Sequence, residues 1–135
     1  MMFCWINPQF LTNDQLLLIA ESLNAAPDYE RLEGRELLLK LLQSEAHAFT
    51  FGEGNIIILE RRRGKDESAR VNVVALAGDL TARTMLELAS FCKNVAAEWG
   101  CDAIETTTYD PRIARAIVKL GGRIESQNLI LPVGD

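Results

Sequence analysis

The strongest constraint on the fold is a β-rich run, an amphipathic helix and a second β-rich run that follow one another between Arg70 and Thr108. Val73–Ala77 is uniformly apolar, which is typical of a strand covered on both faces. A helix capped by Thr81 should end at Gly100, where a left-handed residue is needed. One helix face is apolar through Met85, Leu88, Ala89, Cys92, Val95, Ala96 and Trp99. The sequence therefore predicts a right-handed βαβ unit with parallel strands.

The N-terminal part of the chain predicts one short strand and two helices. The strand is expected over Met2–Ile6, and the first helix begins at a capping box made by Thr12 and Gln15. Residues at helical spacing form its predicted inward face: Leu16, Ile19, Ala20 and Leu23. A second helix is expected over Arg35–Glu45, with its buried face formed by Leu38, Leu41 and Leu42.

The remaining segments complete a mixed sheet. A turn rich in glycine joins predicted strands Ala46–Phe51 and Ile56–Arg62, which form a hairpin. Near the C-terminus, Asp110 caps a helix that ends at Gly121, and the inward residues of that helix are predicted to be Ile113, Ala114, Ile117 and Val118. A last strand is expected over Arg123–Leu131. The order β-α-α-β-β-β-α-β-α-β predicts an α+β fold with a mostly antiparallel sheet and helices on both faces.

Length and composition bound the class of protein. At 135 residues, one domain spanning residues 1–135 is expected, and 48% hydrophobic residues can build a core without metals or disulfides. A net charge of −5 argues against a nucleic-acid-binding surface, because such affinity comes mostly from basic residues. No basic residue precedes Arg31, and no apolar run approaches bilayer length, so neither a secretory signal nor a membrane partner is expected. The three cysteines, Cys4, Cys92 and Cys101, lack C-x-x-C spacing, and we expect reduced, mostly buried thiols in the cytoplasm.

Two C-terminal motifs carry a resemblance to a known family. They are Ala96-x-x-Trp99-Gly100-Cys101-Asp102-Ala103-Ile104 and the helix from Asp110-Pro111-Arg112-Ile113 to Lys119-Leu120-Gly121-Gly122. With the order of elements, they resemble the GNAT (Gcn5-related N-acetyltransferase) fold over about Phe3 to Leu131. The short chain and the spacings of these motifs are also similar to small GNAT-like proteins of tailed bacteriophages.

The resemblance implies a place for acyl-CoA. In the family the pyrophosphate binds backbone N–H groups at the start of the helix after the fourth strand, where the helix dipole favours an anion. The corresponding residues here are Ala77, Gly78, Thr81, Ala82, Arg83 and Thr84. The family's Arg/Gln-x-x-Gly-x-Gly/Ala pattern is absent, and Asp79 would repel a phosphate.

The catalytic positions also depart from the family pattern. The general-acid Tyr corresponds to Ile117, the Asn that opens the last helix to Asp110, and the aromatic after Gly to Gly122. General acid–base catalysis needs a titratable group near the reacting amine. The best substitutes are Tyr109 as acid and Glu105 as base.

Other polar and aromatic residues have both functional and structural interpretations. The cluster Arg61-Arg62-Arg63-x-Lys65 could hold a phosphate, an acidic partner or the 3′-phosphate of CoA, or could keep a hairpin end soluble. Glu60 and Glu105 could act as bases, or could pair with a neighbouring Arg. His47 lacks evident partners for nucleophilic catalysis or a metal site, so no metal is expected. Trp5 and Phe10 could be core residues or dimer contacts.

Two functions from different classes follow. The first is a GNAT-fold protein without catalysis, a binding, assembly or virion-associated component of phage type, located in the host cytoplasm or the virion, with a protein partner or as a homo-oligomer. The alternative is an N-acyltransferase that uses acetyl-CoA on a small-molecule or protein amine. Positioning alone can supply much of such a rate, so a missing Tyr does not exclude it.

Overall fold

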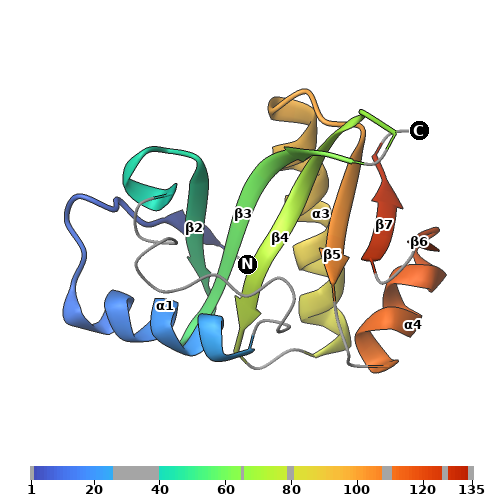
Figure 1. Ribbon diagram of the computed structural model, residues 1–135. Helices are drawn as coiled ribbons and strands as arrows, with labels where there is room; N and C mark the ends of the chain where they lie inside the picture. The colour runs from blue at the N-terminus through green and yellow to red at the C-terminus, as the bar shows by residue number, and fades with distance from the viewer. Residues whose placement is uncertain are drawn as a thin grey trace. The chain divides into compact units, whose positions relative to one another are not determined.

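A mixed sheet of seven strands forms the framework of the protein. The computed structural model describes residues 2–25, 40–64, 66–78, 81–107, 111–125 and 128–133. Its elements, drawn in Figure 1, are β1 (Phe3–Trp5), α1 (Asn13–Ala25), β2 (Ala46–Phe51), β3 (Asn55–Arg63), β4 (Ala69–Ala77), α3 (Ala82–Glu98), β5 (Ala103–Thr107), α4 (Pro111–Lys119), β6 (Arg123–Glu125) and β7 (Asn128–Pro132). The strands follow the order β1-β2-β3-β4-β5-β7-β6. β4 and β5 pair in parallel, whereas the β1–β2, β2–β3, β5–β7 and β6–β7 pairs are antiparallel. The α+β class is confirmed.

The chain groups into two compact units. Unit 1 consists of Met1–Glu60 and Val74–Asp79, and unit 2 consists of Arg61–Val73 and Leu80–Asp135. Strands β3 and β4 therefore contribute residues to both units. The single domain expected over residues 1–135 stays a prediction.

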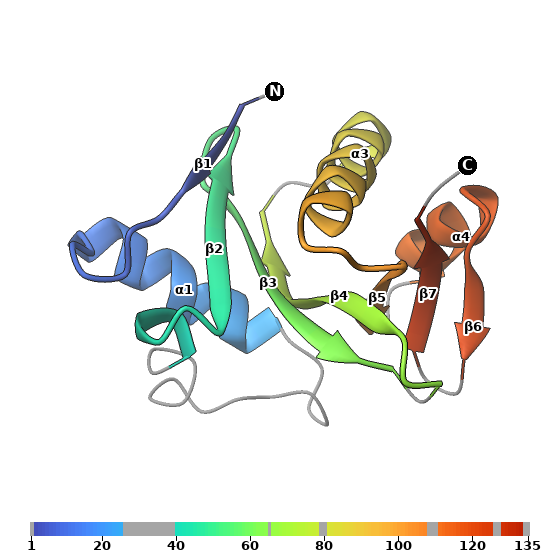
Figure 2. The ribbon, with the colours of Figure 1, turned by 90° about the horizontal axis from the view of Figure 1, so that it is seen from above.

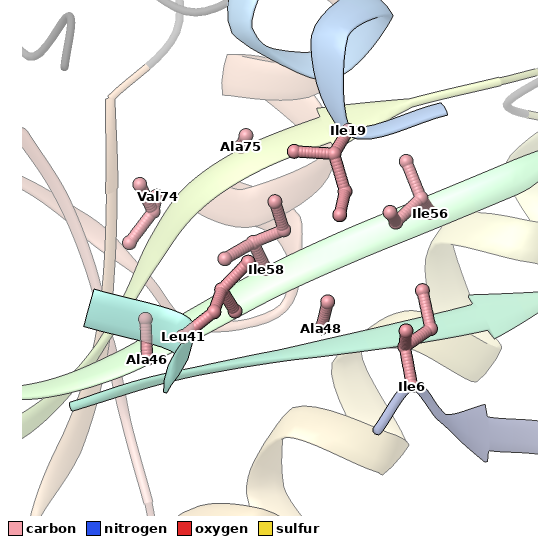
Figure 3. Packing of buried hydrophobic residues seen from close by; sticks show 9 residues of the cluster. All are labelled: Ile6, Ile19, Leu41, Ala46, Ala48, Ile56, Ile58, Val74 and Ala75. Atoms are coloured by element: carbon pink, nitrogen blue, oxygen red, sulfur yellow. The ribbon is translucent and has the colours of Figure 1, made fainter. Parts of the chain in front are cut away.

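Unit 1 is built around a small apolar core. Figure 3 shows its nine buried residues, which come from the residue after β1, from α1, from the helical turn before β2, and from three strands: Ile6, Ile19, Leu41, Ala46, Ala48, Ile56, Ile58, Val74 and Ala75. Alternate residues of β2 and β3 contribute to it, because successive side chains of a strand point to opposite faces. The short side chains of β2 and β4 leave room for the branched residues of α1 and β3.

The beginning of α1 agrees with the sequence, but its buried face differs. Gln15 N–H donates to Thr12 Oγ1 at 3.2 Å, and Thr12 N–H donates to Gln15 Oε1 at 2.9 Å, which confirms the capping box. Ile19 is buried as predicted. The prediction for Leu16 is wrong, since 40% of this residue is exposed. The helix turns Leu18 rather than Leu16 toward the core.

The second predicted helix is described only in its last turn. Lys40–Leu42 is helical, and Ser44, at φ 58°, follows it, so the helix ends before the predicted Glu45. Leu41 is buried as predicted, whereas Leu42 is 49% exposed, which corrects its assignment to the inward face. The other residues of the predicted segment, Leu38 among them, lie outside the described residues.

The βαβ prediction is confirmed in unit 2 by the parallel register of β4 and β5. Val71 lies opposite Ile104, and Asn72 lies opposite Glu105. Helix α3 packs against β5, and Leu88, Cys92, Val95 and Ala96 are buried on its inner face. Figure 2 shows α3 and α4 from above.

Glycine ends α3 as the sequence predicts. Gly100 has φ 69°, and its N–H donates to the carbonyl of Ala97. The N–H of Cys101 donates to the carbonyl of Ala96, which completes a Schellman motif. Gly121 closes α4 with the same pattern of hydrogen bonds, from Gly121 N–H to Val118 and from Gly122 N–H to Ile117.

The C-terminal segment contains two corrections. The single strand predicted over Arg123–Leu131 is two short antiparallel strands, β6 and β7, with Ile124 opposite Leu129. α4 packs against both of them. Ile117 is buried as predicted, but Val118 is 50% exposed, because the short helix presents only one narrow face to the sheet.

The cysteines are free thiols in two environments. Cys92 and Cys101 are buried, as expected, whereas Cys4 is exposed on β1. The expectation of mostly buried thiols therefore holds for two residues and is wrong for Cys4. Burial raises the pKa of Cys92 to about 12.

Candidate functional site

The start of α3 is the first part of the predicted cofactor site. Thr81 is the N-cap, and its Oγ1 accepts the Thr84 N–H at 3.1 Å. The two hydroxyls lie 2.9 Å apart and hydrogen-bond each other, and Thr84 is buried. Helix geometry leaves the N–H groups of Ala82 and Arg83 without an intrahelical acceptor. Both hydroxyls therefore stabilise the helix end, and two backbone donors remain for an anion.

The Arg83 side chain is a weak phosphate ligand as it lies here. It is 90% exposed, and its Nε is 3.5 Å from Glu87 Oε1 one turn along the helix. An exposed ion pair of this kind contributes little energy, so a ligand could recruit Arg83 at small cost.

The end of β4 is the second part of the predicted cofactor site. Ala77 is half-buried and packs against the core of unit 1. Gly78 has φ 132°, a conformation that favours glycine. A Cβ on Gly78 would lie 1.8 Å from Asn55 Oδ1. The carboxamide of buried Asn55 therefore fills the space beside Gly78.

The predicted base Glu105 lies in a buried polar cluster of unit 2. Glu105 is 3% exposed, and Arg62 Nε lies 3.3 Å from its Oε2. Asn72, also buried, occupies the neighbouring register position on β4. Neighbouring residues of parallel strands at one level point to the same face, so Asn72 and Glu105 share a face of the sheet. The guanidinium of Arg62 balances the carboxylate charge there.

The basic cluster of β3 makes contacts within unit 2. Arg61 Nε donates to the carbonyl of Trp99 at 3.3 Å, Arg62 pairs with Glu105, and Arg63 Nη1 lies 3.7 Å from Glu67 Oε2. These contacts favour the structural interpretation of the cluster. Lys65 lies outside the described residues.

A buried arginine at the start of β4 contacts the turn between β3 and β4. Arg70 is 1% exposed; its Nε donates to Ser68 Oγ at 3.3 Å and its Nη2 to Asp66 Oδ1 at 3.2 Å. Two hydrogen bonds from Ser68, and then the charge of Arg70, lower the pKa of Asp66 to about 2. A Cβ on Gly64 would lie 2.2 Å from Arg70 Nε, so the guanidinium lies directly against this glycine.

Glu60 and His47, the remaining candidates for catalysis, have contacts that favour a structural role. Glu60 pairs with Lys40 at 2.8 Å. His47 lies on β2. Burial lowers the pKa of His47 below 6.5, and a backbone hydrogen bond with Ser44 has a smaller effect that raises it.

The described residues include no group of three or more His, Cys, Asp or Glu that could hold a metal ion. None of the helices in the described part of the chain has the length and apolar character that crossing a bilayer requires.

Tyr109, the predicted acid, lies outside the described part of the chain, as do Asp79 and Asp110, the predicted cap of the last helix. The position that corresponds to the family's catalytic Tyr is described. Ile117 is buried there, and a Cβ on Gly122 would lie 2.5 Å from its Cγ2. The close contact explains why glycine, and no aromatic residue, occupies position 122.

Solved structures resemble the chain along its whole length. The NatC complex bound to Gag peptide and CoA contains a chain with a TM-score of 0.68 and 14% identity, and the match covers 98% of each chain. A probable acetyltransferase matches with a TM-score of 0.63, 16% identity and full coverage of both chains. The chain has the GNAT fold.

A GNAT-family acetyltransferase from Staphylococcus aureus is a third similar structure, with a TM-score of 0.61, 11% identity, and coverage of 98% of this chain and all of the other. No protein-family model matches the sequence, and no curated protein sequence does. At these identities the GNAT fold is shown, and the activity is a separate question.

The sequence analysis did not identify three buried polar residues as part of a site. Asn55 begins β3 and reaches Gly78, Asn72 lies beside Glu105, and Arg70 fills the β3–β4 turn. The signal in the sequence was a polar residue within an otherwise apolar strand. Asn72, between Val71 and Val73, is the clearest case. A polar residue in a covered strand must find a buried partner, which sequence spacing does not identify.

Proposed function

We propose that the protein is a GNAT-fold binding protein without catalytic activity, and the observation that carries this proposal is the position of Asn55. Its carboxamide fills the space beside Gly78, the one glycine that remains of the predicted pyrophosphate loop. A pyrophosphate needs backbone donors that it can approach closely. A buried amide against the glycine opposes that approach.

The surroundings of the catalytic candidates support the same proposal. Glu105 has its charge balanced by Arg62, so its carboxylate is held by a guanidinium and not directed at an amine. Ile117 provides no proton at the family's Tyr position. A divergent GNAT-fold protein of this kind fits a binding, assembly or virion-associated role of phage type, in the cytoplasm of a host or in a virion.

A protein partner is the ligand class that we favour. The GNAT-fold chain of the NatC complex is part of an assembly with other proteins, which shows that this fold can serve as a subunit. A net charge of −5 and the intramolecular pairing of Arg61, Arg62 and Arg63 argue against nucleic acid as the partner.

Calorimetric titration with acetyl-CoA and with CoA tests the proposal. We expect no binding heat even at millimolar ligand. Micromolar binding that is weakened by Arg83→Glu would contradict it, because Arg83 is the one basic side chain on the first turn of α3. Glu98→Gln, on the last turn of the same helix, is the matched control and should leave any titration unchanged.

The alternative function is an acetyl-CoA-dependent N-acyltransferase. It is favoured by the acetyltransferase neighbours and by the two donors that α3 offers at Ala82 and Arg83. Glu105 and Tyr109 would then be base and acid. An acetyl-transfer assay over a panel of amines tests it: in an enzyme, Glu105→Gln and Tyr109→Phe lower turnover by about 100-fold or more, whereas the binding protein shows no turnover in any variant.

A further inference from the structure

The outer face of α4 carries positive charge that no described acidic side chain balances. The helix packs against β6 and β7 (Figure 1), and Ile117 is buried on that side. Arg115 and Lys119 are exposed, and Val118, one turn after Arg115, is 50% exposed. Among the residues that the structure describes, no side chain forms an ion pair or hydrogen bond with Arg115 or Lys119. Arg115, Val118 and Lys119 form a basic and apolar surface, the α4 surface.

The charge of this segment is opposite to that of the rest of the chain. Residues 111–123 contain four basic residues and no Asp or Glu: Arg112, Arg115, Lys119 and Arg123. The other residues hold ten of the fourteen Lys and Arg and all nineteen Asp and Glu, a net charge of −9. A basic segment on an acidic protein attracts a partner whose charge is complementary to that segment.

The spacing of the two cations is unfavourable for the helix itself. Arg115 and Lys119 are four positions apart, and like charges at this spacing destabilise a helix. Arg83 on α3 has Glu87 at the same spacing instead. Lys119 lies in the last turn of α4, where the helix dipole favours a cation, so the cost falls on Arg115. Folding therefore favours an acidic residue at this position, whereas a ligand of negative charge favours Arg115.

We propose that the α4 surface binds an acidic segment of a partner protein, in which an apolar side chain lies beside carboxylates. Arg115 and Lys119 bind the carboxylates, because charge-assisted hydrogen bonds are the strong ones and a guanidinium can form two of them with one carboxylate. Val118 packs against the apolar side chain. The inference rests on the proposed function, since it names the chemistry of the protein partner.

The composition of the α4 surface favours a protein segment over a nucleic acid or a lipid surface. Two residues four positions apart span about 6 Å along a helix, so a short acidic segment can contact this surface alone. An extended polyanion reaches further and meets the net charge of −9 on the rest of the chain. The exposed Val118 also offers an apolar contact that phosphate groups do not use.

The exposed aromatic residues near the N-terminus lack such a selection by charge. Trp5 and Phe10 are 53% and 75% exposed, so the core interpretation of both residues is wrong. The first thirteen residues contain no Asp, Glu, Lys or Arg, and no charge in that stretch selects a partner. The dimer-contact interpretation of Trp5 and Phe10 therefore stays a prediction.

Fluorescence anisotropy with a short labelled peptide of repeated Glu-Glu-Leu tests the proposal. We expect the wild type to bind this peptide at low salt and not to bind its Gln-Gln-Leu counterpart, and salt should weaken binding because it screens exposed charges. Arg115→Glu should weaken binding by about five-fold or more, and Val118→Ser by about two-fold. Lys93→Glu, on α3, makes the same change of net charge outside the α4 surface and should bind as the wild type does.

Arg115→Glu also separates binding from folding. This substitution puts an acidic residue four positions before Lys119, which is the favourable orientation of an ion pair on a helix. Urea unfolding should therefore show a midpoint at least as high as that of the wild type while the peptide affinity falls. A lower midpoint would assign Arg115 a structural role and overturn the proposal.

Three binding results would also overturn the proposal. They are a wild type that does not bind the Glu-Glu-Leu peptide at millimolar concentration, a folded Arg115→Glu that binds it as tightly as the wild type, and tighter binding of a single-stranded oligonucleotide or phosphatidylserine vesicles than of the peptide. If the peptide fails and CoA also fails to bind, the non-catalytic function stands and only the α4 surface is excluded. Micromolar CoA binding contradicts the proposed function whatever the peptide does.

Discussion

At the scale of single residues, the distance from a glycine to its neighbouring atoms decides whether that position tolerates a side chain. Gly78 combines a positive φ of 132° with a neighbour, Asn55, that a Cβ would meet at 1.8 Å. Gly54 has φ 71°, and a Cβ there would meet no atom within 4 Å. The same substitution therefore has two different costs at these glycines.

We predict that Gly78→Ala lowers the free energy of unfolding by about 2–4 kcal/mol, from backbone strain together with overlap on Asn55. Gly54→Ala is the matched control and should cost about 1 kcal/mol, from strain alone. Urea unfolding of both variants measures the difference. Equal costs would show that Asn55 moves aside freely, which would also weaken the argument that it closes the space beside Gly78.

Asp66 gives the turn between β3 and β4 a dependence on pH. Hydrogen bonds from Ser68 hold its folded pKa at about 2, below the value of 3.8 in the unfolded chain. A carboxyl group with a lowered folded pKa contributes its stability above the unfolded pKa and loses it as the pH falls through the folded pKa.

We therefore predict that Asp66→Asn destabilises the protein at neutral pH and that this difference shrinks as the pH falls from about 3.8 toward about 2. Urea titrations of wild type and variant across this range measure it. Asp102→Asn, at an exposed position in unit 2, is the control. A difference between Asp66→Asn and wild type that stays constant with pH would contradict the prediction.

At the scale of elements, the ends of α3 were predictable because capping is local. A threonine before the first turn and a glycine after the last one have sequence signatures, and both are confirmed by hydrogen bonds within five residues along the chain. The buried faces of short helices were less predictable. Leu16, Leu42 and Val118 are exposed because neighbouring elements, which spacing does not encode, decide which stripe is covered.

We predict that Thr81→Ala lowers the free energy of unfolding by about 1 kcal/mol, because the Thr84 N–H loses its acceptor and the Thr84 hydroxyl loses its partner. Ser90→Ala, at an exposed site in the middle of α3, should change it by less than about 0.5 kcal/mol. Thermal or urea unfolding compares them. A neutral Thr81→Ala would mean that another group caps α3.

At the scale of the whole molecule, the three thiols report on folding. Cys4 is exposed, whereas Cys92 and Cys101 are buried and carry pKa values raised by burial. The thiolate is the reactive form, so both effects slow modification of the buried pair.

We predict that a thiol reagent modifies one cysteine rapidly in the native protein and all three in denaturant. Mass spectrometry identifies Cys4 as the fast site, and Cys4→Ser should remove the fast phase alone. Slow labelling of Cys92 then follows opening of unit 2. Rapid native labelling of Cys92 would contradict the packing of α3 against β5.

The α+β class, the parallel β4–β5 pair, the caps of α1 and α3 and the order of the described elements up to α4 follow from the amino-acid sequence alone, whereas the division of the last strand into β6 and β7 does not. They depend on periodicity and on contacts between near neighbours along the chain. Tertiary packing was needed to show that Asn55 lies against Gly78, that Arg62 neutralises Glu105, and that Trp5 is exposed at the sheet edge. The two contacts join residues far apart in sequence, and the exposure of Trp5 depends on which elements cover its strand. Packing decides both the partners and the burial of these residues, and no local sequence pattern records them.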